Sequence, residues 1–243
     1  MDAKILYTPI LKGKANDLKA LGRLPRPLAS HMLPMVELLA PNEGERIDAN
    51  CMRFSSQLQK YCPLQTVSLD LHSIAPADRM TDRSMALEAL CANLRGLRIP
   101  FVPVFGFDHE PELWDRIARI ASREGRGLTF RLKLEDIEDS DGTTAEIIRR
   151  LGHANIAAGA TNLLIDLSTV AGMDPVDIVS ARELVQDFID RAFTVRDFAL
   201  ISVVGSTWLP DSLRFWRVCP TGSLRRRSLL RQLSTKTKRP ARA

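Results

Sequence analysis

Short apolar runs recur along the chain, and longer segments of mixed polarity separate them. We predict a strand in each run, because most are four to eight residues long and rich in Val, Ile, Leu or Phe. Several runs are continuously apolar, which is typical of strands buried on both faces. The predicted strands cover residues 5–11, 32–39, 66–71, 101–105, 128–134, 163–167 and 198–204.

The segments between these runs read mostly as amphipathic helices. Apolar residues fall three and four apart in three stretches, as on the buried face of a helix. These are Leu87, Leu90, Cys91, Leu94 and Leu97; Leu113, Trp114, Ile117 and Ile120; and Leu184, Val185, Phe188, Ile189 and Phe193. Asp174 and Pro175 fit an N-cap followed by the first helical position.

Strands that alternate with helices predict an α/β protein with a parallel sheet. Seven such units favour a (β/α) barrel of the TIM type, which closes with eight. We find no convincing eighth strand, so we expect an incomplete barrel with seven recognisable strands. The alternative is an open doubly wound parallel sheet, which seven strands also fit. Pro9, Pro34 and Pro103 lie inside predicted strands. They count against the predicted strands, because proline is poorly tolerated in central strands.

The net positive charge of the chain comes from its C-terminal end. From Arg214 to Ala243 there are ten Lys or Arg residues and no acid, and without them the chain has 24 basic and 29 acidic residues. We therefore expect one barrel-like domain over residues 1–220 and a basic, flexible tail over 221–243. We expect no nucleic-acid contact, except by the tail with a phosphate backbone.

Composition narrows the class of protein further. The 243 residues suffice for one large α/β domain, and no apolar run approaches the roughly 20 residues of a membrane span. The N-terminus lacks the pattern of a signal peptide, so we expect a cytoplasmic protein without a membrane partner. The cysteines are irregularly spaced, and we expect reduced core thiols at Cys51, Cys62, Cys91 and Cys219.

Candidate functional residues come from the rule that sites gather at the carboxyl ends of parallel strands. A charge inside a buried strand is costly unless it is paired, so each needs an explanation. The shortlist is Lys12, Glu37, Asp70, His72, Arg131, Lys133, Asp166 and Ser206.

Two main interpretations of these charges remain open. One is a buried network in which Asp70 or Asp166 bridges to Arg131 or Lys12. The other is a ligand site, where Lys12 and Arg131 bind an anionic small molecule. In that site Glu37 or Asp70 would act as a base, with Asp166 as the third carboxylate of the catalytic set. A divalent metal on Glu37, Asp70 and Asp166 is a third option, but we assign no metal and no cofactor.

Two further residues are weaker candidates for ligand binding. Among four scattered histidines only His72 lies at a predicted strand tip. Ser206, within Gly205-Ser206-Thr207, could offer backbone N–H groups to an anion. The established nucleotide, serine-hydrolase and zinc-protease motifs are absent from the sequence.

Several segments together resemble the beta protein family of phages and prophages. They are Tyr7-Thr8-Pro9-Ile10-Leu11-Lys12-Gly13-Lys14, Asp17-Leu18-Lys19-Ala20-Leu21, Leu33-Pro34-Met35-Val36-Glu37, Leu69-Asp70-Leu71, Ile99-Pro100-Phe101-Val102-Pro103-Val104, Phe130-Arg131-Leu132, Leu164-Ile165-Asp166-Leu167 and Ser206-Thr207-Trp208-Leu209-Pro210. The resemblance implies a TIM-barrel layout and a place in mobile accessory loci. Lys12, Glu37, Asp70, Arg131 and Asp166 match charged strand-end positions, to which the family brings no assigned chemistry. Family members continue for many tens of residues, whereas this chain turns Arg-rich from Arg217, as a truncated or frame-altered C-terminus would.

The resemblance implies a phage or prophage accessory protein that acts in a defence or toxin-neutralising system. It would work through contact with a protein partner encoded nearby, and its molecular activity is unknown. The alternative is a barrel enzyme acting on a phosphorylated or nucleotide-like small molecule. Whether the chain is an enzyme is left open at this point.

Overall fold

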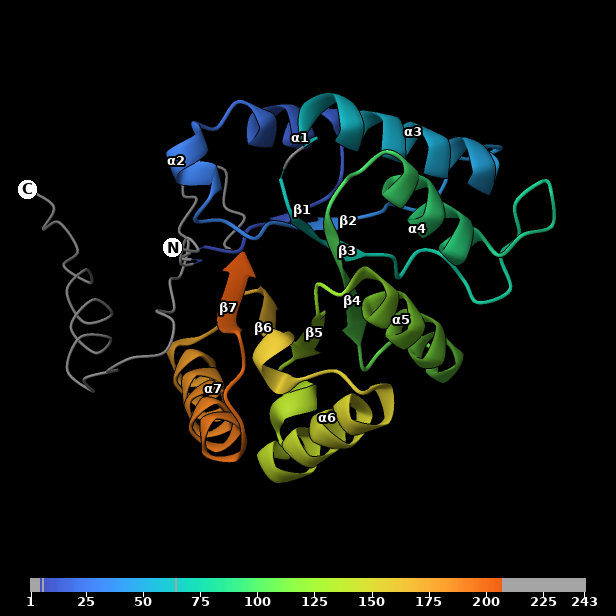
Figure 1. Ribbon diagram of the computed structural model, residues 1–243. Coiled ribbons are helices and arrows are strands. Elements are labelled where there is room, and N and C mark those ends of the chain that lie inside the picture. The colour runs from blue at the N-terminus through green and yellow to red at the C-terminus, as the bar shows by residue number, and fades with distance from the viewer. Residues whose placement is uncertain (1–4, 6, 64, 207–243) are drawn as a thin grey trace, which may run out of the picture.

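The computed structural model describes residues 5, 7–63 and 65–206 (Figure 1). Seven strands alternate with helices along this part of the chain. The strands are β1 (Ile10–Leu11), β2 (Met35–Glu37), β3 (Val67–Asp70), β4 (Phe101–Gly106), β5 (Leu128–Lys133), β6 (Thr161–Thr169) and β7 (Leu200–Ser206). The helices are α1 (Ala15–Gly22), α2 (Arg26–Ala29), α3 (Ile47–Tyr61), α4 (Ala86–Gly96), α5 (Pro111–Glu124), α6 (Ser140–Ala154) and α7 (Pro175–Val195), with 3-10 turns at Glu135–Ile137 and Ala158–Ala160.

Every predicted strand is present, although the first two are shorter than expected. Pro9 and Pro34 stand directly before β1 and β2, so neither proline interrupts a strand. Their carbonyl groups still accept hydrogen bonds, from Met35 N–H and Ser68 N–H respectively. Pro103 lies within β4 and faces Leu69 of β3 in the register. Proline therefore shortens these strands without removing them from the sheet.

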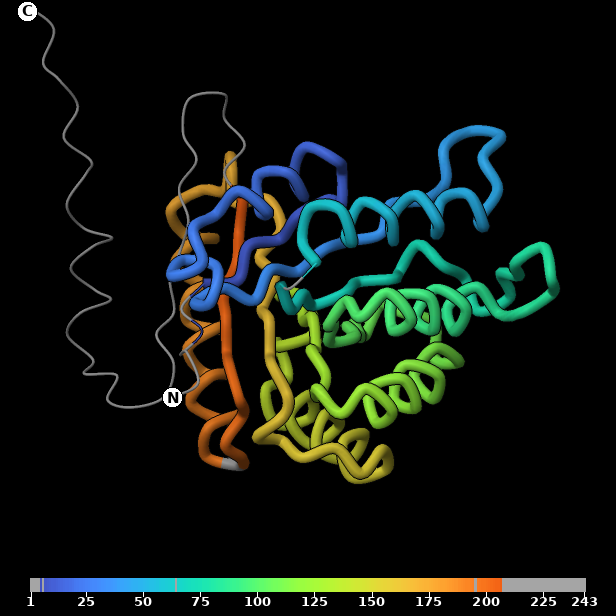
Figure 2. Tube along the Cα trace, turned by 45° about the horizontal axis from the view of Figure 1, so that its top comes forward, coloured from blue at the N-terminus to red at the C-terminus, as the bar shows by residue number. Residues whose placement is uncertain are grey.

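The seven strands form one parallel sheet whose spatial order follows the chain order. A doubly wound sheet reverses its strand order at a switch point, so that alternative is wrong. The sheet also curls strongly. Arg131 of β5 lies 2.7 Å from Glu37 of β2, three strands away, whereas a flat sheet would separate such strands by about 14 Å. The result is the predicted barrel, with seven parallel strands in a nearly closed ring (Figures 1 and 2).

The ring comes close to closing between its first and last strands. The hydroxyl of Thr8, just before β1, lies 3.3 Å from that of Ser202 on β7. These strands stand at opposite ends of the sheet order, so only a nearly complete circle brings their side chains together. The residues after β7, where we expect no complete eighth unit, lie outside the described ones.

The barrel interior is filled by three tiers of side chains, as period-two strands predict. The tier toward the amino ends is polar: Ser68 and Asn162 each hydrogen bond to Thr129, at 3.1 and 3.3 Å. The middle tier is apolar and consists of Met35, Val104 and Leu164, flanked by Ile10 and Val204. The tier at the carboxyl ends is charged and forms the candidate site described below.

The outer face of the sheet packs against the helices, as the apolar periodicity predicts. Trp114 of α5 stacks on Phe130 of β5 with ring centroids 5.9 Å apart, and Phe105 packs edge-on against both rings. The N-cap predicted at Asp174 is confirmed, because its carboxylate accepts N–H bonds from Val176 and Asp177. The three cysteines in the described part are free and buried, as expected.

Several expectations fall on residues outside the described ones. Cys219, the basic tail over 221–243 and its boundary with the domain belong to this group, so those statements stay predictions. Within the described residues, no helix combines the length and the hydropathy that a bilayer crossing requires.

Candidate functional site

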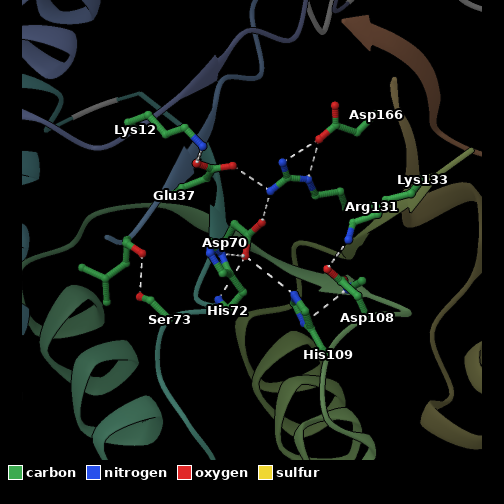
Figure 3. A network of polar contacts seen from close by, with 12 residues as sticks. Lys12, Glu37, Asp70, His72, Ser73, Asp108, His109, Arg131, Lys133 and Asp166 are labelled. Carbon is green, nitrogen blue, oxygen red and sulfur yellow. Dashed lines mark hydrogen bonds and ion pairs between the residues drawn. The ribbon is translucent and has the colours of Figure 1, made fainter. Parts of the chain in front are cut away.

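Arg131 stands at the centre of the charged tier and binds three carboxylates from three other strands (Figure 3). Its Nη1 donates to Glu37 Oε1 at 2.7 Å and to Asp70 Oδ2 at 2.6 Å. Its Nε and Nη2 both donate to Asp166 Oδ2, at 3.0 and 2.6 Å. The guanidinium thus spans the barrel mouth and ties β2, β3 and β6 to β5.

The strand register explains why these four residues meet. Glu37 faces Asp70 across β2 and β3, while Arg131 faces Gly106 across β4 and β5. Gly106 has no side chain that could stand between Arg131 and the acids on the far side of β4. The parallel arrangement then carries all four to the same edge of the sheet, as the carboxyl-end rule predicts.

A bulge in β6 fixes the third carboxylate. The register with β7 shifts between Asp166 and Thr169, and Ser168 adopts a left-handed backbone with φ of 54°. In that conformation the Ser168 N–H donates to Asp166 Oδ1 at 2.8 Å. Bulges and left-handed non-glycine residues are often found beside functional sites. Here they orient Asp166 so that its other oxygen faces Arg131.

The network favours the ionised forms of Asp70 and Arg131 despite their burial. Burial by itself would raise the pKa of Asp70, but the hydrogen bond with His72 and the charge of Arg131 outweigh it and hold that pKa far below its usual range. Burial would likewise lower the pKa of Arg131, and the contacts with Asp166 and Asp70 raise it instead. Desolvation is thus more than offset by pairing, as buried charges require.

Two histidines from different loops converge on Asp70. The Nδ1 atom and the backbone N–H of His72 both lie 3.1 Å from Asp70 Oδ1, and the side chain is half-exposed. His109 is buried, with Nε2 3.8 Å from the same oxygen, and its Nδ1 accepts the Gly106 N–H. That acceptor role leaves the proton of a neutral His109 on Nε2, toward Asp70.

The two histidines are shifted in opposite directions. The hydrogen bond with Asp70 raises the pKa of His72, whereas burial lowers the pKa of His109. A pair of titratable groups with diverging pKa values is a pattern found in acid–base sites. The mouth of the barrel therefore presents a half-exposed imidazole whose pKa is raised and a buried imidazole whose pKa is lowered.

We expect an Asp70→Asn variant to lower the pKa of His72, because the carboxylate that favours the imidazolium is lost. His72 in the wild type adds stability below its unfolded pKa, about 6.5, and loses it as pH rises through the folded value. An NMR titration of the imidazole signals in both proteins measures the shift. His153, which makes no ion pair among the described residues, is the internal control. An unchanged His72 pKa in the variant would show that Asp70 does not hold the proton.

The structure brings most of the predicted site residues together. Lys12 joins Glu37, with its Nζ 2.5 Å from Oε2, and Lys133 pairs with Asp108 at 2.9 Å beside His109. Ser206 stays apart from Arg131, because its hydroxyl donates to the Ser168 carbonyl at 3.2 Å. The catalytic and ligand-binding roles assigned to these residues are not tested by their positions and stay predictions.

Of the two interpretations of the strand-end charges, the buried network is the one observed. Asp70 and Asp166 both bridge to Arg131, while Lys12 reaches Glu37 instead. None of the five strand-end charges lines the cavity of about 340 Å³ that lies beside them, among the loops after β1 and β2. Within the described residues, no group of three metal-ligating side chains is arranged to hold an ion. Arg131 is thus paired with three carboxylates.

Asp108 and His109 were missed by the sequence analysis. The shortlist reached at most two residues beyond a predicted strand, and both residues lie further than that from the strand predicted over 101–105. The same carboxyl-end rule, extended three residues into the loop after Gly106, would have included both.

Comparisons with known proteins identify a family and nothing further. The family model described as Beta protein matches residues 7–226, which is most of the chain. The searches of curated proteins and of solved structures found no match.

Proposed function

The chain belongs to the Beta protein family, and from this membership we propose that it is a phage or prophage accessory protein. In this proposal it acts in a cytoplasmic defence or toxin-neutralising system, through contact with a protein partner encoded nearby. The setting comes from kinship, which is an associational argument. The contact has physical support in the surface of the described residues.

One observation carries the proposal of a protein contact. Val176, Ile178 and Val179, in the first two turns of α7, are 71%, 42% and 45% exposed. Val176 and Val179 are three residues apart and therefore lie on the same helix face. We call these three residues the α7 patch. Exposed apolar side chains that share a helix face, as those of Val176 and Val179 do, are a feature of protein-binding surfaces.

The barrel mouth fits the same proposal. Arg131 and the three acids satisfy one another, so the network stabilises the fold without needing a ligand. Such a scaffold can present a surface patch rigidly to a partner.

We expect a Val176→Asp/Val179→Asp double variant to lose its partner, because two buried contacts would become desolvated charges. Affinity should fall about tenfold or more. The measurement is co-purification with the products of neighbouring genes, alongside survival of host cells under phage challenge. Met52→Asp is the matched control, since Met52 is an exposed apolar residue on α3. Equal co-purification and equal survival for the double variant and the control would refute the proposal.

A second candidate function is a barrel enzyme acting on an anionic small molecule. The half-exposed imidazole of His72, held by buried Asp70, favours it, because an oriented imidazole suits general acid–base catalysis. The same survival assay separates the two candidates. A His72→Gln variant should abolish protection if the enzyme is responsible, and should leave it intact if the α7 patch is.

A further inference from the structure

A cavity of about 340 Å³ lies beside the charged tier, at the carboxyl ends of β1 and β2. The loop after β1, the loop after β2 and one face of α3 enclose it. Its volume is at the lower end of the range for small-molecule sites, about 300–1,000 Å³. Arg131 and the acids it binds do not line it, so this space is separate from the network.

The charged lining of this cavity is entirely basic. Lys14 and Arg53 are its only charged lining residues, and no acid is among them. Arg53 is bonded to Glu45 and to Asn50 Oδ1, which fixes the guanidinium at the wall. Those bonds use two of its five N–H donors, which leaves others for a ligand. Among the described residues Lys14 is exposed and forms no ion pair, so its ammonium is available.

The remaining lining combines amide groups with an apolar floor. Asn42, Asn50 and Gln57 contribute side-chain amides, and Phe54 and Leu38 contribute buried apolar surface. Asn50 is itself held by a 2.9 Å hydrogen bond to the Leu39 carbonyl. A few fixed polar groups around an apolar floor are typical of sites for small organic molecules.

Gly13 shapes the cavity through its backbone. Its φ is +63°, and a Cβ atom there would lie 2.5 Å from the Glu37 carbonyl oxygen and 3.0 Å from the Phe54 ring. Only glycine lets the chain pass this close to the end of β2 in that conformation. The close passage then brings Lys14 to the rim of the cavity.

We propose that this cavity binds a small organic anion, a phosphate monoester or a carboxylate with a compact apolar body. Lys14 and Arg53 contact the anionic group, the Gln57 amide hydrogen bonds to it, and the body fills the rest of the cavity. Asn42 and Asn50 are held by Glu45 and by the Leu39 carbonyl and shape the wall. The site goes beyond partner contact by the α7 patch and does not depend on it. It also lies apart from Arg131, which one of the two interpretations of the sequence assigned to an anion.

The test titrates the full chain with phenyl phosphate as the probe and monitors binding by ¹⁵N NMR. We expect saturable shifts of the Gly13 and Lys14 amide signals and of the Asn50 and Gln57 side-chain amides. Benzyl alcohol, which lacks the charge, should bind about tenfold more weakly. No shifts at these positions up to millimolar probe would overturn the proposal.

Variants assign the binding to the cavity. Lys14→Met should weaken phenyl phosphate about tenfold without loss of stability, since Lys14 is exposed and makes no ion pair in the described structure. Lys19→Met is the matched control, because Lys19 is an exposed lysine further along α1 and outside the cavity. Arg53→Gln gives a second, independent loss. Equal affinity of wild type, Lys14→Met and Arg53→Gln would refute the site, whatever the outcome of the partner experiment.

Discussion

Replacing Arg131 with methionine should lower the free energy of unfolding by about 3–5 kcal/mol. The change leaves Glu37, Asp70 and Asp166 close together and buried, with their common cation gone. Breaking a buried ion network costs this much because uncompensated charge remains in a poorly solvated site. Urea denaturation at pH 7 measures the loss, and the melting temperature should fall on the order of 10 °C.

The pH dependence of this variant has a definite sign. Without the charge of Arg131 the folded-state pKa of Asp70 rises, so protonation of this carboxyl favours the folded variant. Its deficit against the wild type should therefore shrink as pH falls from 7 toward 4. A deficit that stayed constant over this range would mean lost packing rather than uncompensated charge.

Arg149→Met is the matched control for this experiment. Arg149 also binds a carboxylate with two donors, that of Glu146, but it lies 67% exposed on the surface of α6. Exposed pairs of this kind contribute about 0–1 kcal/mol. If Arg131→Met cost no more than this control, the network would not be a main support of the barrel.

Replacing Gly127 with alanine should cost about 2–5 kcal/mol, from backbone strain and steric overlap together. Gly127 has a φ of +86°, and a Cβ atom there would lie 1.7 Å from the Ala160 carbonyl oxygen. The atom that the Cβ would meet belongs to the backbone of Ala160, so no flexible side chain can move aside to relieve the overlap. The glycine lets the turn before β5 lie against the start of β6. The register of these two strands pairs Arg131 with Leu164 and Lys133 with Asp166, so the Arg131 side chain reaches Asp166 diagonally.

Gly125→Ala separates the two contributions. Gly125 lies in the same turn and also has a positive φ, of +63°, but a Cβ atom there would meet nothing within 4 Å. It should therefore show the strain alone, about 1–2 kcal/mol by urea denaturation. Equal losses in the two variants would contradict the predicted overlap with Ala160.

The strands and their order were accessible from the sequence because buried parallel strands are continuously apolar and alternate with amphipathic helices. Asp70 and Asp166 were also identifiable, since each interrupts such a run and a buried charge demands a partner. Their partner Arg131 could be named for the same reason. Pattern alone could not tell a barrel from a doubly wound sheet, because the two differ in spatial strand order rather than in the alternation of elements.

Other features depend on three-dimensional detail that no sequence pattern encodes. Arg131 contacts acids from three strands only because the sheet curls. The periodicity of apolar residues along the chain carries no information about this curvature. His109 approaches Asp70 from a loop that follows a glycine, so no strand-end charge marked it. The α7 patch was equally hidden, because Val176 and Val179 resemble the core residues of the same helix until their exposure is known.

The apolar middle tier of the barrel gives protons no path between its two ends. Met35, Val104 and Leu164 are all but inaccessible to solvent and fill the cross-section between the hydroxyl-lined end and the charged mouth. Along the described interior they offer no group that could relay a proton or hold a water molecule in transit. Protons therefore reach His72 and Asp70 from the mouth, and none passes along the described interior to the hydroxyl-lined end.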